Sequence, residues 1–218
     1  MFRLTKIPAG SQLIQLLKNQ IKKAKLPGQV AHRAMSPASY RSRTIPTGTD
    51  PRLGAVTISL YQKNETLHFP LIQRPIYKGT HSGQISLPGG KVELQDVNLE
   101  DTACRETLEE IGLALDSNHI ISELSSIYIP PSNFLVHPFL AFYDQKPAFI
   151  PEEREVAAIL EIPLFHLLDD QYLSERVVYR LGEKEIKSRV FVFQDQVVWG
   201  ATAMMLNELK HIILRLEG

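Results

Sequence analysis

The stretch "GGKVELQDVNLEDTACRETLEEIG", from Gly89 to Gly112, holds an unusual concentration of negative charge. Seven acidic side chains lie between Glu93 and Glu110, and a single basic one, Arg105, lies among them. Like charges at such short spacing repel one another, so a stretch of this kind calls for a source of positive charge from outside it.

The second half of this stretch has the spacing of an amphipathic helix. We expect the helix to run from about Asn98 to Ile111, with Gly112 in the C-cap role. At about 100° per residue, Glu106, Glu109 and Glu110 fall within about 100° of one another. Glu106 and Glu110 are like charges at i, i+4, which costs about a few tenths of a kcal/mol. Clustered carboxylates are the ligands of hard divalent ions such as Mg²⁺ and Mn²⁺, so the pattern favours a metal site.

An acidic helix face is more often simply solvated, and this alternative stays open on the three glutamates alone. The preceding "SLPGGKVE", residues 86–93, adds weight to the metal interpretation. Its Pro-Gly-Gly lies between an expected strand and the loop that leads to the helix, and glycines let backbone groups approach a ligand closely.

The remaining pattern predicts an α+β fold. "GAVTISLY" and "TLHFPLIQR" are apolar runs separated by "QKNE", which indicates a hairpin, and further strands are expected within residues 121–144, 154–164, 176–181 and 188–200. Amphipathic helices are expected from Ser11 to about residue 25 and over the last 18 residues. We therefore expect a mixed sheet flanked by helices. Residues 1–50 are expected to form an N-terminal helix and an extended connection, and residues 51–218 the main domain.

Composition excludes several classes of function. Lys plus Arg and Asp plus Glu both number 24, which gives no support for binding to nucleic acid or to an anionic membrane. The chain has one cysteine, no signal-peptide pattern and no apolar run of membrane-spanning length. We expect a cytoplasmic protein.

The segment from Gly90 to Leu113 resembles the signature of the Nudix hydrolases. That signature reads Gly, five residues, Glu, seven residues, then Arg-Glu-aliphatic-any-Glu-Glu-any-Gly-aliphatic, and "RETLEEIGL" matches its core apart from Thr107. Arg105 lies one residue further from Gly90 than the general pattern allows, and Asp96 or Glu93 corresponds to the first glutamate of the signature.

The one-residue insertion resembles the coenzyme A diphosphatase branch of this family. Upstream, "LIQRPIYKGTHSGQISLPGG" is similar to the signature of that branch through Arg74, His81 and Gln84. The match departs at Pro75, at Leu87 and at Gly79, where the branch has an arginine. The loss of that cation leaves the physiological substrate open.

The resemblance implies a Nudix α/β/α sandwich and a metal-dependent site. It assigns metal ligands and catalytic or binding roles to individual positions of this chain. The implied ligands of Mg²⁺ or Mn²⁺ are Glu106, Glu109, Glu110 and the Gly90 carbonyl, with Arg105 orienting a neighbouring carboxylate. Glu155 is the implied general base, with Glu152, Glu153 and the helix glutamates as rivals, and Arg74, His81 and Gln84 are implied to bind the substrate.

The implied reaction is hydrolysis of a diphosphate bond in coenzyme A or an acyl-CoA, giving a phosphopantetheine and adenosine 3′,5′-bisphosphate. Two alternatives are hydrolysis of another nucleotide, such as a dinucleotide or a nucleotide sugar, and a non-catalytic Nudix-like binding module. The sequence leaves open the preferred metal, the role of residues 1–50 and whether the chain forms a homodimer.

Overall fold

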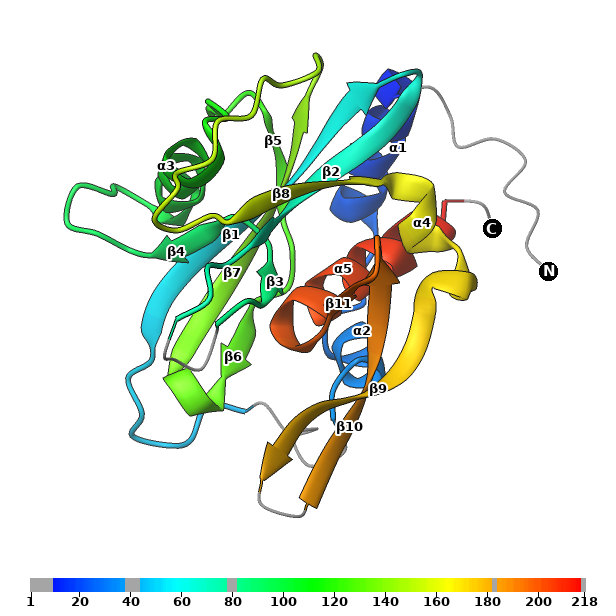
Figure 1. Ribbon diagram of the computed structural model, residues 1–218. Coiled ribbons are helices and arrows are strands. Elements are labelled where there is room, and N and C mark those ends of the chain that lie inside the picture. The colour runs from blue at the N-terminus through cyan, green and yellow to red at the C-terminus, as the bar shows by residue number, and fades with distance from the viewer. Residues whose placement is uncertain (1–9, 38–43, 78–81, 182–183, 217–218) are drawn as a thin grey trace.

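A computed structural model describes residues 10–37, 44–77, 82–181 and 184–216. The described elements form three layers, with a mixed β-sheet between helix α3 on one side and helices α1, α2 and α5 on the other (Figure 1). The expected α+β class, with a mixed sheet flanked by helices, is confirmed. No helix in the described ranges is long and apolar enough to cross a membrane.

Within the described residues the main sheet has eight strands, organised around β1. Strand β1 runs parallel to β7 along most of its length and antiparallel to β2 at one end and to β4 at the other. Strand β2 pairs with β1 only near the hairpin, and its far end pairs instead with β3. The strands are β1 Arg52–Lys63, β2 Thr66–Gln73, β3 Ile85–Ser86, β4 Gly89–Lys91, β5 Ile120–Glu123, β6 Ile127–Ile129, β7 Phe134–Tyr143 and β8 Ala158–Pro163.

The hairpin predicted at "QKNE" is confirmed. Asn64 and Glu65 both adopt positive φ between β1 and β2, as the favoured two-residue hairpin turns require. This turn fixes the register of β2, so that Ile72 and the residues after it reach the middle of the sheet beside β3.

Helix α3, Leu99–Ile111, covers one face of the sheet and has the predicted ends. The Asn98 side chain accepts a hydrogen bond from the Asp101 N–H, and Gly112 ends the helix in the left-handed conformation. Small residues let the helix approach β1 closely, since Ala103 packs on Ala55 and Phe139. The helix is therefore fixed directly above the strand that β4 borders.

The opposite face of the sheet carries the main hydrophobic core. Helices α1, Gly10–Lys23, and α5, Gly200–Leu214, contribute buried leucines, isoleucines and methionines to it, together with the short α4, Leu164–Leu168. A second, three-stranded sheet of β9 Leu173–Leu181, β10 Lys184–Phe193 and β11 Gln196–Val198 packs beside α5. Two short 3-10 turns, Pro130–Ser132 and Asp170–Tyr172, complete the described elements.

The expected extended connection after α1 contains a short helix, α2, Gln29–Ala34. This helix lies against α5. Six residues are too few to show a helical period, which is why the sequence pattern did not predict α2.

A buried carboxylate holds α2 in place. Glu208 of α5 is fully buried and accepts hydrogen bonds from four donors, which are the N–H of Gly28, Nε2 of His32, and the N–H and Oγ of Ser125. The segment before β1 is thereby connected to both α5 and the β5–β6 junction.

Candidate active site

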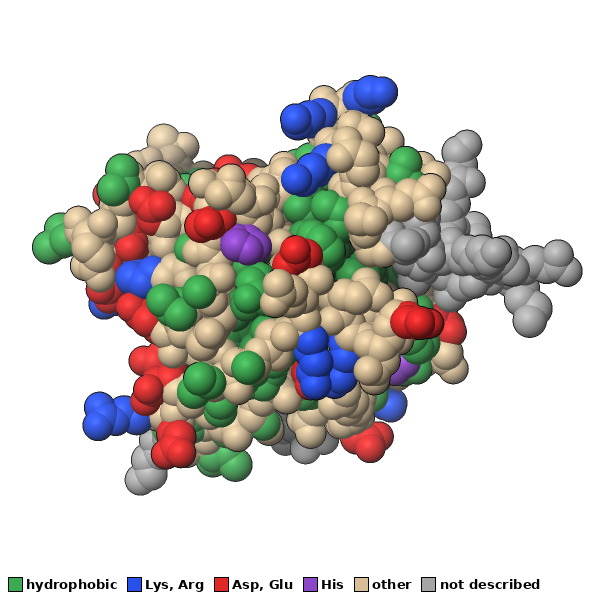
Figure 2. Space-filling view, turned by 90° about the horizontal axis from the view of Figure 1, so that it is seen from above, with side chains coloured by type: hydrophobic (Ala, Val, Ile, Leu, Met, Phe, Trp, Pro, Cys, Tyr) green, Lys and Arg blue, Asp and Glu red, His purple; other side chains and the backbone are tan. Residues whose placement is uncertain are grey.

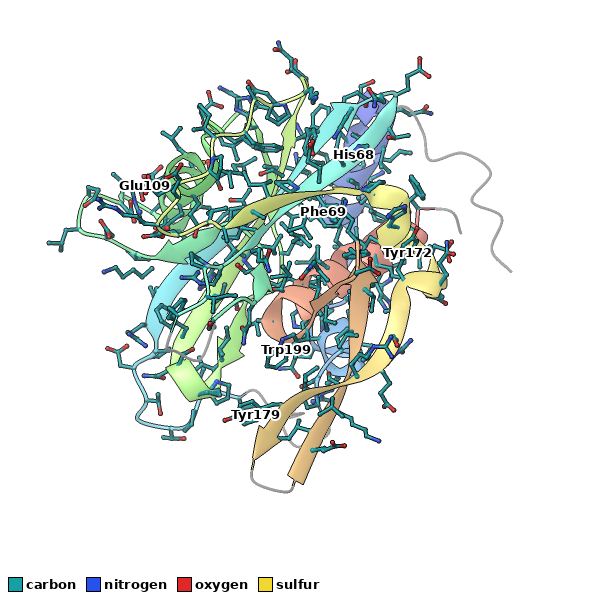
Figure 3. All side chains as sticks on the ribbon, in the orientation of Figure 1. His68, Phe69, Glu109, Tyr172, Tyr179 and Trp199 are labelled. Carbon is teal, nitrogen blue, oxygen red and sulfur yellow. The ribbon has the colours of Figure 1, made fainter. Side chains whose placement is uncertain are left out.

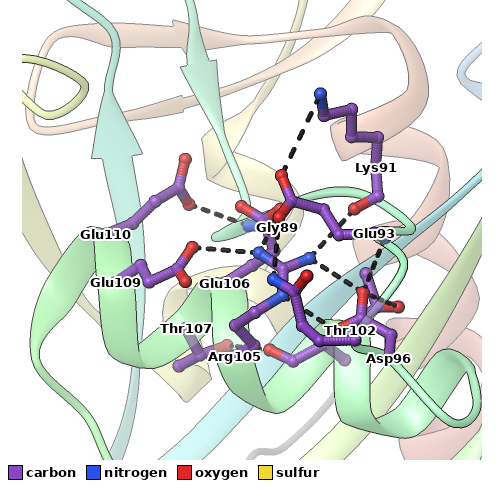
Figure 4. A network of polar contacts seen from close by, with 12 residues as sticks. Gly89, Lys91, Glu93, Asp96, Thr102, Arg105, Glu106, Thr107, Glu109 and Glu110 are labelled. Carbon is purple, nitrogen blue, oxygen red and sulfur yellow. Dashed lines mark hydrogen bonds and ion pairs between the residues drawn. The ribbon is translucent and has the colours of Figure 1, made fainter.

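Three acidic residues of the signature surround one guanidinium group, that of Arg105 (Figure 4). Arg105 donates from Nε and Nη2 to the two carboxylate oxygens of Asp96, each at 2.9 Å, and from Nη1 to Glu106 at 3.0 Å and Glu109 at 2.9 Å. It also donates to the Lys91 carbonyl at 3.0 Å. Arg105 therefore joins the loop before α3 to the glutamates on the helix.

The structure distinguishes Asp96 from Glu93 at the first acidic position of the signature. The side chain of Asp96 is 2% exposed and accepts from both Arg105 and the Thr102 hydroxyl. Glu93 lies 3.9 Å from Lys91 and accepts from Gln95. Of the two candidates, Asp96 is thus the one that pairs with Arg105.

The three helix glutamates differ in environment. Glu110 is 2% exposed, Glu106 is 12% exposed at its side chain, and Glu109 is 56% exposed at its side chain. Figure 3 shows Glu109 on α3, on the far side of the sheet from Trp199. In Figure 2, acidic side chains gather on the side of the molecule that carries α3.

Glycines allow the helix carboxylates to lie against the strand. The Gly89 N–H donates to Glu110 Oε2 at 2.8 Å. A Cβ on Gly90 would collide with the Glu106 carboxylate, so a residue with a side chain would displace that group. Gly89 itself adopts φ +146°, beside the backbone of Ala55 and Val56. The Pro-Gly-Gly of the signature therefore gives Glu106 and Glu110 close access to the backbone.

Burial raises the pKa of Glu110 to about 8, with Glu106 and Glu155 adding to the increase, while the Gly89 N–H and the positive charge of Arg74 oppose it. Burial likewise raises the pKa of Glu106 against the opposing effect of Arg105. Both carboxylates thus lie where a nearby cation would favour their charged form.

The loop that carries Glu155 is attached to the end of α3. The N–H of Ile150 donates to the Ile111 carbonyl at 2.9 Å, and the N–H of Glu152 to the Glu110 carbonyl at 3.0 Å. The Glu155 side chain is exposed, and its charge reaches both Glu106 and Glu110. This attachment could not be predicted from the sequence, because it is made by backbone groups.

Two of the predicted substrate-binding residues, Arg74 and Gln84, flank the paired strands β2 and β3. Arg74 follows β2, and its N–H donates to the Gln84 carbonyl at 3.0 Å, which extends the pairing of β2 with the β3 segment. His81 and Gly79 lie outside the described residues.

The donor set matches a hard divalent cation in chemical type, since it offers buried carboxylates of elevated pKa beside glycine backbone. Among the described residues, no three acidic, histidine or cysteine side chains are arranged to hold an ion together. In this structure Glu106 and Glu109 are paired with Arg105, and Glu110 accepts from the Gly89 N–H.

Comparison with known proteins identifies the family. The model of the NUDIX domain matches residues 50–181. A protein of Yersinia enterocolitica, described as the uncharacterized Nudix hydrolase NudL, is 31% identical over 141 residues, which cover 64% of this chain and 70% of that protein.

The fold is shared with a solved structure. The crystal structure of a MutT/nudix family protein from Enterococcus faecalis has a TM-score of 0.52 at 18% identity and covers 98% of this chain and 81% of that one. The NUDIX domain of Shewanella oneidensis NrtR, solved in complex with ADP ribose, has a TM-score of 0.47 at 20% identity, with 62% and 87% covered.

The chain belongs to the Nudix family. It is a Nudix hydrolase, a pyrophosphohydrolase that acts on a nucleoside diphosphate linked to another group. Enzymes of this family typically use divalent metal ions.

Proposed function

We propose that the protein hydrolyses the diphosphate bond of coenzyme A or an acyl-CoA, giving a phosphopantetheine and adenosine 3′,5′-bisphosphate. The observation that carries the reaction class is the pair of carboxylates of Glu106, which is partly buried, and Glu110, which is buried, held against Gly90 and Gly89. The choice of substrate is supported by the upstream resemblance at Arg74 and Gln84 and by the one-residue insertion between Gly90 and Arg105. Gly79 keeps another nucleotide, such as a dinucleotide or a nucleotide sugar, as the second candidate.

In this proposal Glu106, Glu109, Glu110 and the Gly90 carbonyl hold Mg²⁺ or Mn²⁺. When bound, such an ion neutralises charge on the diphosphate and lowers the pKa of water. Arg105 sets the positions of Glu106 and Glu109 beforehand through its hydrogen bonds. The bonds from Arg105 to Asp96 would hold the guanidinium in place independently of these two glutamates.

The chain's own residues account for the rest of the reaction. Arg74 and Gln84 orient the substrate, and Glu155, exposed beside Glu106 and Glu110, accepts the proton of the attacking water. The water oxygen forms a bond to one phosphorus, the bridging P–O bond breaks, and its electron pair leaves with the other phosphate. The products are two phosphate monoesters.

The test is incubation of the purified protein with coenzyme A, acetyl-CoA, a dinucleotide and a nucleotide sugar, with Mg²⁺, Mn²⁺ or a chelator, and identification of the products by mass. We expect metal-dependent release of phosphopantetheine from coenzyme A. Glu109→Gln should reduce the rate by about a hundredfold or more, because it removes a charge from the site. Glu100→Gln, in the first turn of the same helix, serves as the matched control and should retain activity.

Turnover of only another diphosphate would reject coenzyme A and retain the mechanism. Turnover that is unaffected by the chelator and by Glu109→Gln would reject the metal assignment.

A further inference from the structure

Two buried polar atoms beside the active site have no hydrogen-bond partner in the part of the chain that the structure describes. They are Nε of Arg74 and Oγ of Ser86, and both are shielded from solvent. Buried polar atoms nearly always have a partner, because leaving one without costs about 1–3 kcal/mol. Both groups are hydrogen-bond donors, so a negatively charged oxygen would satisfy them together.

Strand register places the two side chains on the same face of the sheet. Ser86 of β3 lies directly opposite Ile72 of β2, and directly opposite residues project to the same side. Arg74 follows Ile72 by two residues and shares its side, since strand side chains alternate. Ile72 packs against Ile111 and Leu113 at the end of α3. Arg74 and Ser86 are therefore diagonal neighbours on the face that α3 covers.

The same face leads directly to the helix carboxylates. Ser86 precedes Gly89 by three residues, and the Gly89 N–H is bonded to Glu110. Because Arg74 and Ser86 share the face of the sheet that α3 covers, a phosphate group held beside Glu110 would lie on the same side of the sheet as these two donors.

We propose that Ser86 is a substrate-binding residue whose hydroxyl donates, together with Nε of Arg74, to an oxygen of the substrate's diphosphate. This inference rests on the proposed function and adds a residue to it. Reaching these atoms requires the side chain of Arg74, which is partly exposed, to shift as the phosphate enters.

The experiment compares Ser86→Thr with Ser86→Val, which have the same shape and differ in the hydroxyl. Steady-state kinetics are measured on the diphosphate substrate that the wild-type protein turns over best in the panel above. We expect Ser86→Val to lower kcat/KM by about tenfold to a hundredfold relative to Ser86→Thr, the range for a lost hydrogen bond to a charged group. The two variants should unfold at similar temperatures.

A second arm tests whether the two groups share an oxygen. In an Arg74→Ala background the difference between Thr and Val at position 86 should shrink to about twofold or less, because the shared geometry is already lost. An undiminished difference in that background would contradict the sharing.

The control is Ser59→Ala. Ser59 is a fully buried serine whose Oγ likewise has no partner among the described residues, but it lies on β1, two residues after Thr57, rather than on β3. Its loss should leave kcat/KM unchanged. Equal kinetics for Ser86→Thr and Ser86→Val in a protein that is active as wild type would overturn the inference and leave the proposed function intact. An inactive wild-type protein would instead reject the proposed function.

Discussion

In the ion pair of Asp96 and Arg105, both carboxylate oxygens of Asp96 accept hydrogen bonds. Asp96 uses both oxygens for Arg105 and also accepts from the Glu93 N–H and the Thr102 hydroxyl. These hydrogen bonds, above all those from Arg105, hold the pKa of Asp96 well below its usual range. A carboxyl whose pKa is lowered by folding stabilises the folded protein at every pH at which the same carboxyl is ionised in the unfolded chain.

Asp96→Asn should therefore destabilise the protein at pH 7 by about 2 kcal/mol, because it weakens the charged hydrogen bonds with Arg105. The loss is limited because Arg105 keeps its bonds to Glu106 and Glu109. The contribution of Asp96 is complete above the pKa of an unfolded aspartate, about 4, and is lost as the pH falls towards the lower folded pKa. The difference between the two proteins in free energy of unfolding should accordingly shrink below about pH 4.

Urea denaturation at several pH values between 3 and 7 measures this difference. Glu93→Gln is the matched control, because Glu93 lies in the same loop and does not bond Arg105. A difference that is constant with pH would show that Asp96 acts through shape and not through charge.

For individual residues, the sequence predicted which side chains form the site better than it predicted which of them bond to one another. The residue types and their spacing indicated Glu106, Glu109, Glu110 and Arg105. The choice between Asp96 and Glu93 depends on how the loop turns, and Ser86 carries no charge that would have marked it. Such contacts depend on strand register and loop conformation, which one sequence does not reveal.

Among the elements, the contact of α3 with β1 explains why the signature has threonine where the family has an aliphatic residue. Thr107 donates to the Thr57 hydroxyl at 2.9 Å, and both hydroxyls lie within hydrogen-bonding distance of the Ala103 carbonyl. Both threonines are fully buried. A polar pair on the helix and the strand thus replaces an apolar contact.

Replacing both threonines by valine should cost less than the sum of the two single replacements. Each of Thr57→Val and Thr107→Val leaves its partner with fewer bonds and should cost about 1 kcal/mol, whereas removing both partners together is nearly neutral. Chemical denaturation of the four proteins provides the double-mutant cycle. Additive costs would indicate that each hydroxyl acts through Ala103 alone.

Helix and strand positions were predictable where local signals were strong. Asn98 and Gly112 set the ends of α3, and the turn at Asn64 set the first hairpin. The run of residues 188–200 was expected as one strand, but it is two, β10 and β11, because Gln194 and Asp195 adopt positive φ. Neither residue is glycine, so the turn had little signal in the sequence.

Across the whole molecule, Glu208 links parts that are far apart in the sequence. The division into residues 1–50 and a domain of residues 51–218 remains a prediction, while Leu13, Leu17 and Met35 lie in the same core as the helices that follow the sheet. Because these contacts are extensive and buried, we expect both parts to unfold in one transition.

Glu208→Gln should lower the free energy of unfolding by about 3 kcal/mol. Each carboxylate oxygen of Glu208 accepts from two donors, and the NH₂ group of glutamine cannot accept in place of one of these oxygens. Hydrogen exchange should accelerate first at the amides of α2, which depends on Glu208 for its attachment. Thermal denaturation and exchange measured by mass spectrometry are the readouts.

The matched control is Glu123→Gln, which alters another contact between glutamate and histidine. Its partner is His137 at 2.6 Å, and the side chain of Glu123 is 46% exposed, so the change should cost less than about 1 kcal/mol. Equal losses for the two variants would show that burial of Glu208 is not the source of its contribution.

The parallel pairing of β1 with β7 also constrains the order in which the protein folds. The two strands are distant in the chain, and the whole signature, from Gly89 to Gly112, lies in the loop that their pairing closes. Contacts of such high contact order form slowly, because chain entropy is lost before the contacts are gained. Because β4 and α3 both pack on β1, we expect the acidic site to reach its final geometry only after this long-range step. A partly folded chain would then contain the signature residues but not the assembled active site.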